Sequence, residues 1–213
     1  MATKHAVPTL QWTDDEAANR LIAEDPMALL IGFCLDQQIT VEKAFMGPLV
    51  ITQRLGTIDA NQLARMNAAR IEQAFVTPPA VHRFPASMAG RVHALCTMIA
   101  SEYGGDAAAI WTTASDAADL RRRLGALPGF GPMKATIVLA VLVKRFGVKL
   151  PGSAELLPDW TTLADVRTIA ERREYQANKR AHKARLRAQA AATPIRKAVR
   201  RTAPVAAARK PAR

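Results

Sequence analysis

The sequence predicts an all-α fold over roughly residues 10–170. Alanine is abundant and aromatic residues make up only 5% of the chain, a balance that favours helices over sheets. Apolar residues recur at helical spacing between capping residues, and sustained β-type alternation is rare. With 213 residues, 49% of them hydrophobic, the chain is long enough to bury a core.

Three helices are predicted in the first 56 residues, each from the residues at its boundaries. Short polar residues cap a helix start, proline fits the first helical position, and glycine ends a helix. The signals here are Thr13 to Glu16, Asp25 with Pro26, and Thr40 with Gly56. The corresponding helices run over about 13–23, 26–38 and 40–55.

Further helices follow from the same signals. A short helix begins at Asp59, a second spans 67–75, a third spans 86–105 after the Pro-rich loop 77–85, Ser115 caps a fourth over 116–127, and an apolar helix follows Gly131.

The excess of basic residues lies entirely at the C-terminal end. Residues 1–170 contain 16 basic and 16 acidic residues, whereas residues 171–213 contain 14 and 2, which accounts for the net charge of +12. A terminal helix is expected over 167–187, and the Ala, Lys, Arg and Pro composition of 188–213 predicts disorder. We therefore expect a helical domain over 10–170 and a basic segment over 171–213.

A basic segment of this kind binds nucleic acid phosphates through salt-sensitive contacts. Both DNA and RNA remain open as partners, and a solubilising tail without a dedicated partner is the alternative.

The cysteines and histidines predict neither a metal site nor an iron–sulfur cluster. Cys34 and Cys96 each lie in an apolar helical pattern, as buried reduced thiols do. The chain has no C-x-x-C pair, and its four histidines have no ligand spacing. No secretory signal is evident, and no stretch approaches 18 uncharged apolar residues. We expect no membrane association and a cytoplasmic, nucleoid-associated location.

The run Leu127-Pro128-Gly129-Phe130-Gly131 predicts a tight turn between two helices. Both glycines permit positive φ and close approach of another backbone. The start of the following helix presents N–H groups and a positive dipole end, which together favour a phosphate. Lys134, in the first turn, is expected to add a charged phosphate contact. An ordinary helix–turn–helix corner is the alternative.

Two segments resemble the helix-hairpin-helix DNA glycosylase superfamily, which acts in base-excision repair. The hairpin 127-LPGFGPMKATIVLAVL-142 is similar to the family's L-P-G-[VI]-G signature, and 28-ALLIGFCLDQQITVEKA-44 is similar to its early helix and Gln-containing turn. Strings at 25–38, 82–92 and 127–135 resemble a small actinobacterial-type branch without an iron–sulfur cluster.

The resemblance implies a set of DNA-binding residues. They are Leu127, Pro128, Gly129, Phe130, Gly131, Met133 and Lys134 in the hairpin, with Gln37 and Gln38 near the DNA gap. For the two glutamines, a polar helix end that bonds the loop backbone is the alternative. His82, Arg83 and Phe84 contact DNA or simply separate two packed helices.

The catalytic aspartate that the family carries after the hairpin is missing from its usual place. Counted from Gly131, that place holds Pro151, and the nearest candidate is Asp159, with Glu155 and Asp165 as other acids of the loop. A carboxylate there would stabilise the positive charge that develops on the sugar when the N-glycosidic bond breaks. A loop carboxylate or helix cap is the alternative for Asp159, and a helix start for Asp165.

The expected function is double-stranded DNA binding in base-excision repair by a monomer, with hydrolysis by a monofunctional DNA glycosylase as the reaction. Met133 stands where lyase-competent members carry their lysine nucleophile, so no lyase activity is expected. No cofactor is expected, although the resemblance allows a monovalent cation at the hairpin. The alternative is a catalytically inactive DNA binder that lacks the aspartate.

Overall fold

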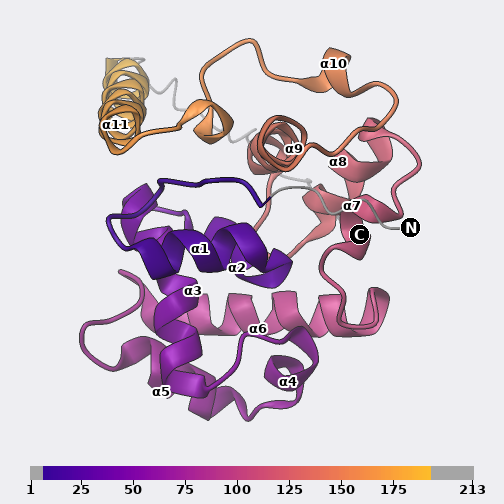
Figure 1. Ribbon diagram of the computed structural model, residues 1–213. Coiled ribbons are helices and arrows are strands. Elements are labelled where there is room, and N and C mark those ends of the chain that lie inside the picture. The colour runs from indigo at the N-terminus through magenta and orange to yellow at the C-terminus, as the bar shows by residue number, and fades with distance from the viewer. Residues whose placement is uncertain (1–6, 193–213) are drawn as a thin grey trace, which may run out of the picture. The chain divides into compact units, whose positions relative to one another are not determined.

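The computed structural model describes residues 7–192, with the backbone alone for residue 180 and for 182–192 (Figure 1). Over this range it contains α-helices and one 3-10 helix and no strand, which confirms the predicted all-α class. The elements are α1 Glu16–Glu24, α2 Pro26–Leu35, α3 Val41–Leu55, α4 Ala60–Arg65, α5 Ala68–Val76, α6 Pro85–Glu102, α7 Ala109–Thr112, α8 Ala117–Ala126, α9 Pro132–Phe146, α10 Ser153–Leu156, η1 Leu163–Asp165 and α11 Ile169–Ala192.

The backbone contacts divide the chain into two units, residues 1–178 and 179–213, so α11 runs from the first unit into the second. Residues 193–213, for which the sequence predicts disorder, lie outside the described part. Residues 188–192, also predicted to be disordered, are the last residues of α11.

Several predicted boundary residues act as caps. The Asp25 carboxylate accepts hydrogen bonds from the N–H groups of Met27 and Ala28, and Pro26 is the first residue of α2. Thr40 caps α3, and Asp59 caps α4. Each side chain accepts a bond from an amide that has no partner within its helix, which fixes the start of the helix.

Other predicted boundaries are wrong by a few residues. The helix expected to reach residue 38 ends at Leu35, because Asp36 and Gln37 leave the helical conformation to form a turn. The cap of α8 is Asp116 instead of Ser115, since the Asp116 carboxylate accepts the Asp119 N–H bond. The short elements α7, α10 and η1 were not predicted, because four residues or fewer cannot display a helical period.

Helix α2 occupies the centre of the core. Every residue from Met27 to Leu35 is buried, as expected for a helix that is apolar on all sides. Gly32 allows α3 to come close, since a Cβ there would lie 2.5 Å from the Phe45 ring. Phe33 and Phe45 pack edge-on against each other and against Trp12, which is fully buried.

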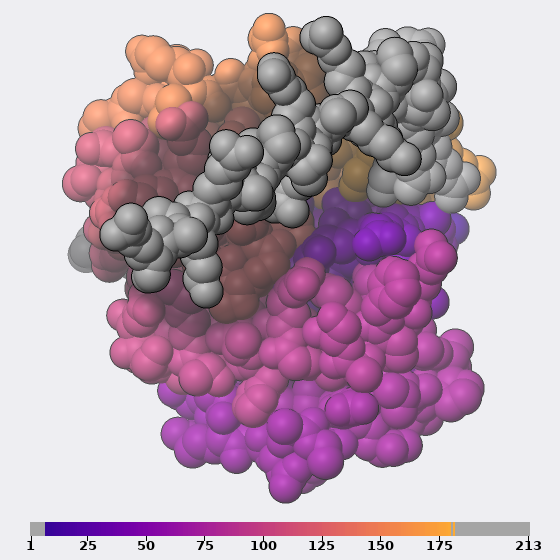
Figure 2. Space-filling model, turned by 180° about the vertical axis from the view of Figure 1, so that it is seen from behind, coloured from indigo at the N-terminus to yellow at the C-terminus, as the bar shows by residue number. Residues whose placement is uncertain are grey.

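The helices of the first unit pack in layers that start from α2. Helices α1, α3 and α6 pack against α2, and α4 and α5 pack against α6 (Figure 1). Figure 2, from behind, shows α4, α5 and α6 side by side as the purple and magenta surface. Helix α9 packs against α8 and η1 and buries a continuous run from Val138 to Leu142.

The start of α11 belongs to the packed unit. Arg172 is only 3% exposed, and it donates hydrogen bonds to the Trp12 carbonyl and to Asp14. Gln176 accepts the N–H of Val41 at the beginning of α3. The first two turns of α11 are therefore held against residues from the other end of the chain.

None of the helices described between residues 7 and 192 is long and apolar enough to cross a membrane.

Candidate nucleic-acid interface

The predicted hairpin forms between α8 and α9. Helix α8 ends at Ala126, Leu127 turns into an extended conformation, and the Phe130 N–H closes the turn on the Leu127 carbonyl at 3.0 Å. Gly131 is the N-cap of α9, and Pro132 is its first residue. Leu127 and Phe130 are buried, so the turn rests on the core through its two apolar side chains.

The two hairpin glycines differ in backbone conformation and in the space around them. Gly129 has φ +85°, and a Cβ on it would lie 2.7 Å from Arg91 Cδ and 3.1 Å from Cys34 Sγ, so it satisfies both a left-handed backbone and a close approach. Gly131 has φ −114°, so the expected positive φ is wrong at this position. A Cβ on Gly131 would meet nothing within 4 Å, which leaves open space at the start of α9.

The Lys134 ammonium group is directed toward the hairpin itself. Its Nζ donates to the Gly129 carbonyl at 3.0 Å and to the Cys34 carbonyl at 3.5 Å, and it lies 5.2 Å from the centre of the Phe130 ring. Lys134 thus ties the turn to the end of α2, a contact that the sequence did not indicate, while the predicted phosphate contact stays a prediction.

Gln37 joins three segments that are distant in sequence. Its Nε2 donates to the Cys34 carbonyl at 2.8 Å and to the Gly129 carbonyl at 3.4 Å, and its Oε1 accepts from Arg91 Nη1 at 2.6 Å. Its backbone carbonyl accepts from His82 Nε2 at 2.8 Å. We call Gln37 and these four partners, Cys34, His82, Arg91 and Gly129, the Gln37 network. Gln37 thus makes the bonds to the loop backbone that the alternative interpretation describes, while its predicted contact with DNA stays a prediction.

Gln38 differs from its neighbour in conformation and exposure. It is exposed, and its φ of +57° is the single positive value at a non-glycine residue in the described part of the chain. A residue with a side chain rarely adopts this left-handed conformation. The turn thus presents the Gln38 side chain on the surface while Gln37 points into the network.

The loop before α6 reaches the same turn through His82. This side chain is buried; its Nδ1 accepts the Phe84 N–H at 3.0 Å, so its Nε2 must carry the proton that it donates to Gln37. Burial is the main cause that lowers the pKa of His82, which keeps the ring neutral. Arg83 and Phe84 are exposed, with the guanidinium 5.1 Å from the ring centre.

Arg91 is the site residue that the sequence analysis missed. It lies in α6, inside the 82–92 string, and its spacing from His82 gave no indication that both reach the Gln37 turn. The half-buried position of Arg91 in α6 is known only from the structure, so the sequence offered no signal for this role.

The three candidate acids differ in how they are held. Asp165 caps η1 with Thr162 and pairs with Lys144 at 2.7 Å; although burial by itself raises the pKa of Asp165, these hydrogen bonds lower it overall. Asp159 is exposed, as is the Trp160 ring beside it, at 48%. No helix begins at residue 160, so the helix-cap alternative for Asp159 is wrong. Glu155 is exposed in α10.

The thiols of Cys34 and Cys96 are free and buried, as predicted. Burial raises the pKa of Cys34 to about 11 and that of Cys96 to about 12, so both remain protonated at neutral pH. Among the residues whose side chains are described, 7–179 and 181, no three His, Cys, Asp or Glu residues form a group that could hold a metal ion.

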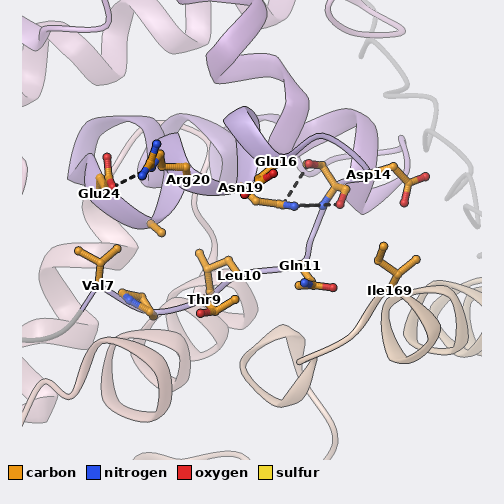
Figure 3. A pocket seen from close by; sticks show the side chains of 13 residues that line it. Val7, Thr9, Leu10, Gln11, Asp14, Glu16, Asn19, Arg20, Glu24 and Ile169 are labelled. Carbon is orange, nitrogen blue, oxygen red and sulfur yellow. Dashed lines mark hydrogen bonds and ion pairs between the residues drawn. The ribbon is translucent and has the colours of Figure 1, made fainter.

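A pocket of about 390 Å³ lies away from these residues, between the N-terminal segment and α1 (Figure 3). It is lined by Thr9, Leu10 and Gln11 on one side and by Asn19 and Arg20 on the other. Arg20 pairs with Glu24 within α1, whereas Asn19 bonds the Thr13 backbone and so helps to hold the N-terminal segment. None of the predicted site residues lines this pocket.

No protein-family model matches the chain, and no curated protein or solved structure is significantly similar to it.

Proposed function

We propose that this chain binds double-stranded DNA through the α8–α9 hairpin, as a base-excision repair protein of the helix-hairpin-helix glycosylase type. The observation that carries the proposal is the unobstructed start of α9. Gly131 contributes no side-chain cap, and the space beside it is open. The N–H groups in the first turn of a helix have no partners within the helix and lie at the positive end of its dipole. A backbone phosphate fits this position.

The surroundings of the hairpin support the same partner. Four exposed residues come from three segments: Gln38 from the turn after α2, Arg83 and Phe84 from the loop before α6, and Met133 from the first turn after the hairpin. The Gln37 network joins the turn after α2, the loop before α6 and the hairpin. We call these four residues, with Gly131, the DNA-facing surface. Apolar and planar side chains beside a phosphate site suit a nucleic acid whose bases can be stacked or displaced.

The direct test replaces the phosphate with a side-chain carboxylate. In Gly131→Asp, the carboxylate caps α9 and occupies the place proposed for the phosphate. The backbone conformation at residue 131, φ −114° and ψ 177°, is that of an ordinary N-cap. We expect an unchanged or higher melting temperature and at least about a tenfold loss of duplex affinity in fluorescence anisotropy, because a charge-assisted hydrogen bond is replaced by repulsion.

Two matched variants complete this test. Gly131→Asn supplies the same cap without the charge and should lose less affinity than Gly131→Asp. Ala69→Glu places a carboxylate at an exposed position of α5, across α6 from α8 and α9 (Figure 1), and should bind as the unmodified chain does. Equal binding by Gly131→Asp and the unmodified chain would contradict the proposal, as would an equal loss in Ala69→Glu.

Hydrolysis of the N-glycosidic bond is the second part of the proposed function, and it rests on Asp159. Of the acids in the loop, Asp165 is committed to a cap and an ion pair, whereas Asp159 is exposed and accessible to a substrate. A carboxylate would stabilise the oxocarbenium-like sugar or orient water. Binding without catalysis is the other candidate, and the same exposure to water favours it, since catalytic carboxylates are usually enclosed.

Base release separates the two candidates. A panel of duplexes, each carrying one oxidised, alkylated or deaminated base, is incubated with the chain, and released base is measured by mass spectrometry. If Asp159 is catalytic, Asp159→Asn abolishes release while duplex affinity stays within about threefold. If no duplex in the panel releases a base, the protein is a binder without glycosylase activity. Release that persists in Asp159→Asn assigns catalysis to another group.

A further inference from the structure

The hairpin is held in place by a hydrogen-bond network that contains a charged side chain. The Gln37 amide has one acceptor and one donor group, and both are used: Oε1 accepts from Arg91, and Nε2 donates to the Cys34 and Gly129 carbonyls. The reverse orientation would set an oxygen against two carbonyls and an NH₂ group against a guanidinium. Arg91 therefore decides the orientation in which Gln37 can reach the hairpin.

The packing of the hairpin depends on the same arginine. Gly129 lies directly against the aliphatic part of Arg91, so close that a Cβ would be 2.7 Å from Arg91 Cδ. The guanidinium group of Arg91 holds Gln37, which bonds the Gly129 carbonyl, and the aliphatic part of Arg91 packs against Gly129 itself. Both contacts therefore act on Gly129, two residues before Gly131. We therefore expect a displacement of Arg91 to move the start of α9.

We propose that Arg91, acting through Gln37, is a positioning residue that sets the hairpin against the turn after α2 in the geometry required for DNA binding. This inference rests on the proposed function. The DNA-facing surface gathers residues from three segments, and the amides of α9 are useful only if they stand in register with Gln38 and Phe84. Arg91 and Gln37 supply that register, and Gln37 itself is not a DNA contact.

Position and direct phosphate contact have different salt signatures. A protein loses about 0.9 from the slope of log affinity against log salt for each phosphate that a lost Lys or Arg had neutralised. If Arg91 acts by positioning uncharged amides, its removal weakens binding with little change in slope. If Arg91 itself contacts a phosphate, the slope falls by about one.

The experiment measures duplex affinity over a range of KCl concentrations for Arg91→Leu, Arg91→Lys, Gln37→Leu and the Arg91→Leu/Gln37→Leu double variant. Leucine keeps an apolar side chain beside Gly129 and removes the hydrogen bonds. We expect about a tenfold loss in each leucine variant, no further loss in the double variant, an unchanged slope, and recovery to within about threefold in Arg91→Lys, which can still donate to Gln37.

Two results would overturn the proposal. One is an additive loss of affinity in the double variant. The other is a salt slope reduced by about one in Arg91→Leu together with normal affinity in Gln37→Leu. Circular dichroism and thermal melting establish that each variant is folded.

A measurement without DNA separates failure of this inference from failure of the proposed function. Hydrogen exchange of peptides covering 127–134 should be faster in Arg91→Leu and in Gln37→Leu than in the unmodified chain, and exchange in α5 should be unchanged. Faster exchange confined to the hairpin, in a chain that does not bind duplex DNA, leaves the positioning role intact and rejects the DNA-binding function. Unchanged hairpin exchange rejects the positioning role whatever the chain binds.

Discussion

At the level of single residues, Gln37 and Gln38 are neighbours in sequence, but the side chain of one enters a hydrogen-bond network and that of the other lies on the surface. Gln37 continues from the end of α2, and its side chain meets three other segments, whereas Gln38 adopts φ +57° and is exposed. The left-handed conformation turns the chain so that consecutive side chains leave in different directions. A substitution at Gln37 should therefore act on hairpin position, and one at Gln38 on the surface alone.

His82 makes the stability of the same region depend on pH. Because burial lowers the pKa of His82 below its ordinary value of 6.5, the unfolded chain takes up a proton before the folded one does. The contribution of the neutral His82 ring to the free energy of unfolding is fully present above about pH 6.5. It is lost as the pH falls below that value, by up to about 1.4 kcal/mol per pH unit for one proton. A protonated ring could no longer accept the Phe84 N–H, so the loop before α6 should loosen first.

Urea unfolding between about pH 7.5 and pH 5.5 measures this effect. The comparison is with His82→Gln, which has a neutral amide in place of the titrating ring and should show a smaller decrease in unfolding free energy over that range. Equal decreases in the two proteins would mean that another group takes up the proton.

At the scale of the element, the strongest sequence patterns correspond to the most enclosed helices. Helix α2 is buried over Met27–Leu35 and α9 over Val138–Leu142, and both read as apolar runs in the sequence. The hairpin between α8 and α9 was predicted with Pro132 at the first helical position, because glycine and proline have strong local backbone preferences. Ser115 and Asp116 are adjacent and both are good capping residues, so the sequence does not separate them, and only the fold shows that Asp116 meets the Asp119 amide.

Helix α11 combines two environments in one element. Its first turns carry the buried Arg172 and the Gln176 side chain bonded to α3, which lie beyond the boundary at 170 that composition indicated. A composition window averages these two contact residues with the many basic residues that follow. The ion pairs of the buried Arg172 with the partly exposed carboxylates of Asp14 and Glu42 join residues more than 120 positions apart, which no local pattern reports.

At the scale of the whole molecule, charge is divided unequally between the two units. Residues 179–213 carry twelve Lys and Arg and no acidic residue, so the first unit has no net charge excess. If DNA is the partner, removal of 179–213 should weaken duplex binding and reduce the salt slope by about 0.9 for each phosphate that the segment neutralises. Because Arg172 and Gln176 are retained, the melting temperature should stay unchanged.

Affinity measured across a range of KCl concentrations for chains 1–178 and 1–213 tests this prediction. Replacement of the twelve basic residues by glutamine in the full chain is the matched control, since it keeps the length. An unchanged slope after truncation would show that the basic segment does not contact the duplex.

The sequence alone was enough to predict the helical class, the caps Asp25, Thr40 and Asp59, the hairpin at 127–131, and the basic end of the chain. Those features depend on backbone propensity and charge, which are local. The tertiary structure alone shows that Gln37 points inward and Gln38 outward, that Lys134 bonds the Cys34 carbonyl, and that Arg91 and His82 meet at the turn after α2. Such contacts join residues 45 to 100 positions apart, and their formation depends on how the helices pack, because hydrogen-bonding partners in a buried site are chosen by proximity in space.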